Sequence, residues 1–170
     1  MKKSGRTLKQ RLFGLKRLSS RLKRARHFRG HGVHSPFVYD VVRKVFMQKR
    51  MVGESRDLYT ALRQRNIAER RCVQLQNLVA HCGYERWSID SMEACDLMVC
   101  TLDTPHDALK RYARFAQEHH ITLCIIEPYR SSQRWEVCRE ILDKHSSTTI
   151  DNRAYVLVFN NHLPKQRYTL

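Results

Sequence analysis

Apolar and polar positions follow two different periods along the second half of the chain. Residues 97–102 and 121–126 are continuous apolar runs of the length expected for buried strands. After the first run, Thr104 and Pro105 predict the start of a helix, because threonine caps helices and proline suits their first turn. Ser132 predicts a second helix after the second run. This order of strands and helices is typical of an α/β domain with parallel strands.

A short strand and a hairpin extend this pattern in both directions along the chain. Residues 86–90 are a brief strand candidate upstream, and residues 148–150 and 155–159 flank the polar turn Asp151-Asn152-Arg153. Two apolar runs separated by such turn residues predict a closing antiparallel hairpin at the C-terminal end of the sheet.

Helices are predicted before residue 84. Ser35 and Pro36 suit the N-cap and first-turn positions of a helix that runs to Phe46. A short helix is predicted around Leu58, and a longer apolar stripe at helical spacing stops at Gly83, a residue type favoured directly after helix ends.

The first thirty residues combine leucines at helical spacing with many basic side chains, which predicts a basic amphipathic helix. Such a helix suits a polyanion, either nucleic acid or an anionic membrane surface, or a groove on a partner protein. Alternatively, its leucines dock on the body of the same chain and its charges are only solvated. The candidate polyanion-binding residues are Lys9, Arg11, Lys16, Arg17, Arg21, Lys23, Arg24, Arg26 and Arg29.

The net charge of +16 is concentrated at the N-terminal end of the chain. Residues 1–50 hold sixteen Lys and Arg against the single acid Asp40, whereas residues 51–170 are close to neutral. We therefore expect a basic helical arm over residues 1–30, followed by a helical lead-in and one α/β domain of ordinary size over residues 31–170.

Cysteine and histidine positions favour a reduced protein without a metal site. The six cysteines lack C-x-x-C spacing and mostly occupy apolar positions, which predicts buried free thiols. His31 and His34 could be a metal pair or could hydrogen-bond within their turn, but a third ligand is not apparent in the sequence. The sequence also lacks an apolar run of about 20 residues and a secretion signal, so a cytoplasmic location is expected.

Four features of the body are taken together: His31-Gly32-Val33-His34-Ser35-Pro36-Phe37-Val38-Tyr39, the helix that stops at Gly83, Asp103-x-x-His106 after a strand, and Thr148-Thr149-Ile150-Asp151 with Val156-Leu157-Val158-Phe159. This combination resembles a family of bacterial class I S-adenosylmethionine-dependent methyltransferases, best known from Bacteroidetes. The resemblance spans most of residues 27–170. It implies a Rossmann-like sheet and S-adenosylmethionine as cofactor.

The same resemblance implies candidate site residues at the ends of two strands. Asp103 and His106 match a family motif in which Thr104 replaces a glycine, and Glu127 stands where the family has an aspartate pair. In related enzymes these positions lie near the methyl acceptor or a metal ion. Asp103 could equally be an ordinary acidic residue at a strand end, although acids at the carboxyl ends of parallel strands lie where ligands bind.

Relative to the family that it resembles, the chain lacks the segment that would hold the cofactor. Only residues 91–96 separate the strand candidate 86–90 from the run 97–102, and residues 84–170 contain no glycine for a phosphate- or ribose-binding turn. We therefore expect a truncated Rossmann-like methyltransferase sheet that binds no S-adenosylmethionine and acts as a binding or accessory protein through its basic arm. The alternative is an active methyltransferase, alone or completed by a full-length homologue; a chain without selected activity is the third possibility.

The deletion also leads to a prediction about strand direction. A parallel pairing usually needs a crossover of a dozen or more residues, and the sequence provides only six. We therefore predict that residues 86–90 run antiparallel to residues 97–102 or leave the sheet. Apolar surface exposed by the lost elements would favour a homo-oligomer.

Overall fold

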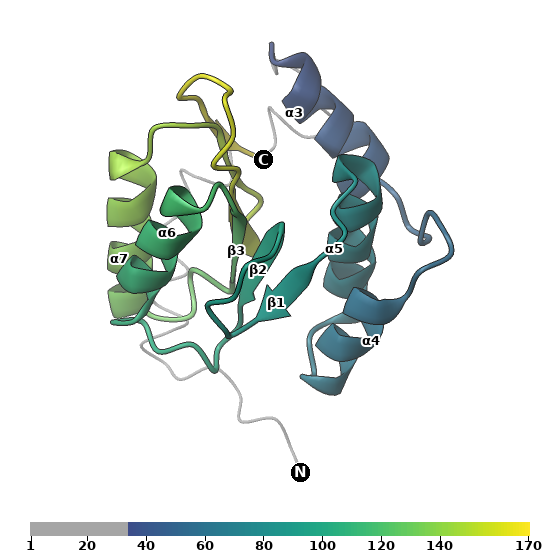
Figure 1. The fold of residues 1–170 in the computed structure, drawn as a ribbon, viewed down its shortest axis with the longest axis horizontal. Helices are drawn as coiled ribbons and strands as arrows, with labels where there is room; N and C mark the ends of the chain where they lie inside the picture. Colours follow the sequence, from purple (N-terminus) through teal and green to yellow (C-terminus); the bar gives the residue numbers. More distant parts are fainter. Residues whose placement is uncertain (1–33) are drawn as a thin grey trace.

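The computed structural model describes residues 34–170, which form a six-stranded mixed sheet covered by helices on both faces. In Figure 1, α3, α4 and α5 lie on one side of the sheet, and α6 and α7 lie on the other. The expected α/β class is therefore confirmed. The helices are α3 (Pro36–Val41), which continues as the π-helix η2 (Val42–Phe46), then α4 (Asp57–Gln64), α5 (Glu69–Cys82), α6 (Leu109–Glu118) and α7 (Ser132–Lys144).

One strand of this sheet, β5 (Tyr155–Val158), runs opposite to the other five. The strands are β1 (Trp87–Ile89), β2 (Leu97–Cys100), β3 (Thr122–Ile126), β4 (Thr149–Asp151), β5 (Tyr155–Val158) and β6 (Arg167–Thr169). Their order is β1-β2-β3-β5-β4-β6. The first three are parallel to one another, β5 is antiparallel to both of its neighbours, and β6 is parallel to β4.

Successive residues of the central strands face opposite layers, which is why these strands are apolar throughout. Leu97 and Val99 of β2 belong to the core under α3, η2, α4 and α5, whereas Met98 and Cys100 belong to the core under α6 and α7. Strands β3 and β5 divide their side chains in the same way. A strand that is buried on both faces has no polar alternation, because neither face meets water.

Several predicted boundaries are confirmed by local geometry. Ser35 caps α3 by accepting a hydrogen bond from the Val38 amide, and Pro36 is the first helical residue. Gly83 ends α5 with a left-handed backbone at φ 66°, a conformation that costs glycine little. The predicted antiparallel hairpin is formed by β4 and β5.

Two predicted features are wrong in detail. Helix α6 begins at Leu109, not at Thr104 and Pro105, because the Thr104 side chain is buried and donates its hydroxyl to Asp90 instead of capping a helix. The third strand of the C-terminal unit, β6, was not predicted. Its residues are exposed or half-buried, so they carry no apolar run.

The predicted direction of residues 86–90 is also wrong: β1 and β2 are adjacent and parallel, with Trp87 opposite Leu97. Strand β1 has only three residues, so the chain must return about 10 Å to start β2 beside it. The connecting residues 90–96 can extend to about 23 Å, which is enough without a helix. Asp96 fixes the return, since its carboxylate accepts hydrogen bonds from the backbone amides of Glu85 and Arg86, both at 2.8 Å.

The six cysteines are free thiols, and five of them are buried, which confirms that most of them are core residues. Burial raises the pKa of Cys72 to about 11 and that of Cys138 to about 12, so both remain protonated at neutral pH. Among residues 34–170, no helix is both long and apolar enough to cross a bilayer. The predicted basic arm, with all nine of its candidate contacts, lies outside the described residues, as does His31.

A buried histidine joins the end of α7 to the end of β5. The His145 ring is 6% exposed; its Nδ1 accepts a hydrogen bond from the Ser147 amide at 2.9 Å, and its Nε2 pairs with the Asn160 side-chain oxygen. An amide can only donate, so Nδ1 must be unprotonated and the ring neutral. Asn160 in turn donates to the Ile121 carbonyl, which extends the connection to the start of β3.

We expect this arrangement to make folding stability depend on pH. Burial lowers the pKa of His145 from its ordinary value of 6.5, against the opposing hydrogen bond to Asn160. The unfolded chain therefore binds this proton first. The contribution of His145 to the free energy of unfolding should be fully present above about pH 6.5. As the pH decreases below this value, the free energy of unfolding should decrease by up to ~1.4 kcal/mol per pH unit.

Urea unfolding between pH 5 and 7 measures this slope. His145→Gln should reduce the slope, whereas His106→Gln, which removes an exposed histidine, should leave it unchanged. Equal slopes in the parent protein and in His145→Gln would contradict the assignment.

Candidate functional site

The carboxyl ends of the three parallel strands meet at one edge of the sheet. Asp90 follows β1, the segment 101–104 follows β2, and Glu127 follows β3. A cleft of about 810 Å³ opens at this edge, between these chain segments and the connection from α4 to α5. Its volume lies within the range of small-molecule pockets, and ligands of open α/β sheets bind at this edge.

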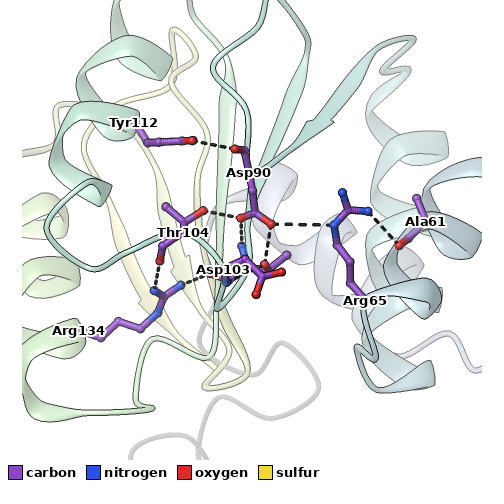
Figure 2. A network of polar contacts seen from close by, with 8 residues as sticks. Ala61, Arg65, Asp90, Asp103, Thr104, Tyr112 and Arg134 are labelled. Atoms are coloured by element: carbon purple, nitrogen blue, oxygen red, sulfur yellow. Dashed lines mark hydrogen bonds and ion pairs between the residues drawn. The ribbon is translucent and has the colours of Figure 1, made fainter.

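Asp90 joins the end of β1 to the loop after β2. Its carboxylate accepts hydrogen bonds from the Thr101 amide at 2.7 Å and from the Thr101 hydroxyl at 2.6 Å, and the Thr104 hydroxyl donates to it as well. Its carbonyl accepts a hydrogen bond from the Tyr112 hydroxyl of α6 at 2.8 Å (Figure 2). The backbone of Asp90 is left-handed, at φ 56°, a conformation that aspartate tolerates better than most side chains.

Arg134 of α7 holds the same loop from the other side, as Figure 2 shows. Its side chain is buried and donates to the carbonyls of Thr104 at 3.0 Å, Thr101 at 2.7 Å and Ile126 at 3.1 Å. Burial lowers the pKa of Arg134 from its ordinary value. The loop after β2 therefore lies between a carboxylate that binds its donors and a guanidinium that binds its acceptors.

The first residue after β1 is held by these contacts. The Asp90 amide donates to the Val99 carbonyl at 2.9 Å, and the Asp90 carboxylate is occupied by Thr101 and Thr104. Neither group is left to face a ligand at this position. A nucleotide-binding turn at the first strand of such a sheet needs open backbone amides and close approach.

The candidate residues from the sequence are only partly brought together. Asp103 and Glu127 both line the cleft, Asp103 as an exposed side chain and Glu127 with a left-handed backbone at φ 48°. His106 lies apart from them, on the exposed surface near α7, beside Lys110 and Glu136. Within residues 34–170, no group of three His, Cys, Asp or Glu side chains could hold a metal ion.

Four arginines that the sequence analysis did not select also line the cleft: Arg65, Arg71, Arg130 and Arg153. Arg65 lies 4.0 Å from the Asp90 carboxylate, and Arg130 lies 3.7 Å from the Glu127 carboxylate. These arginines are far apart in the sequence, so no local charge cluster identifies them. For Arg130 and Arg153 the usable signal is their position just after the ends of predicted strands.

Arg71 has a different environment from the other three arginines. Its side chain is half-buried and donates to the neutral Gln74 amide oxygen at 3.0 Å. Burial lowers the pKa of Arg71; the interaction with Tyr155 opposes this shift, and the charges of Arg70 and Arg153 add to it. The cleft thus holds more positive than negative charge, with one cation placed among like charges.

We expect Asp90 to contribute more to stability than any other acid of this edge. Asp90→Ala removes three acceptor contacts and a carboxylate whose charge acts on the buried Arg134, and should lower the free energy of unfolding by about 3 kcal/mol. Asp103→Ala is the matched control: this acid is exposed in the same loop and should change stability by less than about 0.5 kcal/mol. Urea denaturation measures both values, and equal losses would refute the role of Asp90.

Comparison with known proteins gives no assignment: no protein-family model, curated protein or solved structure matches this chain. A functional proposal therefore depends on the residues and their geometry.

Proposed function

We propose that this protein is a shortened member of the class I S-adenosylmethionine-dependent methyltransferase family that has no methyltransferase activity and acts by binding. The sequence resemblance is one support. Strands β2 and β3 are parallel and are followed by an antiparallel hairpin, which agrees with this part of the truncated arrangement that the resemblance implies. Binding would take place through the basic arm of residues 1–30, on nucleic acid or an anionic membrane surface.

One observation carries the non-catalytic part of this proposal. Directly after β1, the Asp90 carboxylate is already hydrogen-bonded to Thr101 and Thr104 of the next loop. A cofactor of the adenosylmethionine type would need open backbone amides in such a turn. Opening the turn here would break hydrogen bonds to a carboxylate that is mostly buried. It would also move the Asp90 charge, which acts on the buried Arg134.

Calorimetric titration with S-adenosylmethionine tests this. We expect no saturable heat at ligand concentrations up to about 1 mM, which corresponds to a binding free energy weaker than about −4 kcal/mol. S-adenosylhomocysteine serves as the second ligand, because it lacks the sulfonium charge that the arginines would repel. Saturable binding of either ligand by the isolated chain would overturn the non-catalytic assignment.

The second candidate function is catalysis, and the open cleft beside Asp103 and Glu127 favours it. If side chains filled this edge of the sheet, they would exclude an organic ligand, but the cleft is open. In this case the chain would transfer methyl groups either alone or together with a full-length homologue that supplies the cofactor segment. Activity that appears only in the mixture, and is lost in Asp103→Ala of this chain, would support the second candidate.

The basic arm provides a separate test of binding. Affinity for a DNA duplex should fall steeply with salt, with a logarithmic slope of about −0.9 for each phosphate contact. Neutralising Arg17, Arg21 and Arg24 with glutamine should reduce the size of that slope by about two to three. The matched control neutralises Arg63, Arg114 and Arg139, which are exposed on the body.

Anionic lipid vesicles serve as the second probe for the same variants, and they decide between the two kinds of polyanion. An equal effect of the two triple variants would contradict the role of the arm. Binding that does not change with salt would instead indicate that the leucine stripe docks on a protein.

A further inference from the structure

We propose that the cleft lined by Arg65, Arg71, Arg130 and Arg153, called here the arginine cleft, binds an organic phosphate. This goes beyond the proposed function, because it concerns the α/β body and a small molecule, not the arm and a polyanion. The proposal is based on the charge, shape and rigidity of the cleft.

Charge is the first argument. Arg65 and Arg130 each have a carboxylate within 4.0 Å, namely Asp90 and Glu127. Arg71 has no ion pair among residues 34–170, and it lies close enough to Arg70 and Arg153 for their charges to lower its pKa. A half-buried guanidinium beside like charges is unfavourable until an anion neutralises it. Arginine suits phosphate for this role, because its planar donors form two parallel hydrogen bonds with phosphate oxygens.

Shape is the second argument, and it indicates an organic ligand. The volume of about 810 Å³ is far larger than a phosphate ion needs and is typical of pockets for small organic molecules. Ile67, Leu102 and Ala154 provide apolar lining, and the polar side chains of Asn66 and Asp103 stand beside them. A ligand with a phosphate at Arg71 can therefore place an apolar or ring portion on these walls and hydroxyl groups near Asp103.

Rigidity is the third argument. Arg153 is held in a left-handed turn at φ 71°, where the Asp151 carboxylate accepts a hydrogen bond from its amide at 2.8 Å. The Tyr129 hydroxyl donates to the same carboxylate, and the Tyr129 ring stacks on Trp135 with centroids 4.3 Å apart. The two turns that carry Arg130 and Arg153 are thus fixed to each other. Fixed turns lower the entropy lost when a ligand binds.

The experiment titrates the full chain with adenosine 5′-monophosphate and, separately, with inorganic phosphate, and follows the ligand by phosphorus NMR. Arg71→Ala and Arg153→Gly remove one cleft cation each, and glycine keeps the left-handed turn. Arg139→Ala is the control, since it removes the same charge from an exposed position outside the cleft. Saturable binding of the nucleotide should be at least about tenfold weaker in both cleft variants than in the control.

Each outcome decides the proposal. Equal affinities in the three variants, or no saturable binding by the parent protein, would overturn the arginine cleft as a phosphate site. Equal affinities for the nucleotide and inorganic phosphate would overturn the organic ligand. If Arg71→Ala unfolds the chain, Arg153→Gly still decides, because Arg153 is exposed.

The affinity of the cleft variants for the nucleotide can be distinguished from binding of a polyanion by the basic arm. Arg17, Arg21 and Arg24 are intact in all three cleft variants, so binding of the DNA duplex should be the same in each. Failure of the arm to bind a polyanion would leave the comparison between Arg71→Ala and Arg139→Ala unchanged.

Discussion

The loop after β2 depends on being held from both sides by opposite charges, and the edge of the sheet depends on that loop. Asp90 binds the donors of Thr101 and Thr104, and Arg134 binds their carbonyls. Arg134 also binds the Ile126 carbonyl, so α7 and the ends of β2 and β3 are fixed together. Neither charge could stay buried without these partners, because an uncompensated buried charge costs several kcal/mol.

Because β1 is short, β2 can lie parallel beside it without a crossover helix. A three-residue strand can be followed by a parallel neighbour after a seven-residue connection, whereas a strand of ordinary length would need a helix or a much longer loop. The parallel register, in which Ile89 lies opposite Val99, brings Asp90 beside the end of β2, next to Thr101. The left-handed backbone at Asp90 then directs the chain away from the sheet and leaves the carboxylate facing the loop.

Sequence reasoning succeeded where one local signal determined an element and failed where distant residues did. The apolar runs of β2 and β3, the Ser35 cap and the hairpin turn were all predictable, because burial and turn chemistry act over a few residues. The late start of α6 was not, since the Thr104 hydroxyl binds Asp90, fourteen residues away, instead of capping the helix. Asp103 and Glu127 were found at strand ends, but His106 was grouped with them only because it matches the motif of the family that the sequence resembles.

The same contacts hold Asp90 after β1 and shape the cleft beside the ends of β2 and β3. The loop of residues 101–104 turns its threonine donors toward Asp90, and it places Leu102 and Asp103 along the cleft. Arg65 connects both regions, because it lines the cleft and lies 4.0 Å from the Asp90 carboxylate. The edge therefore combines an occupied carboxylate after β1 with a positively charged cleft next to it. Cations that are held in place in a partly buried cleft bind anions more strongly than the same cations in water.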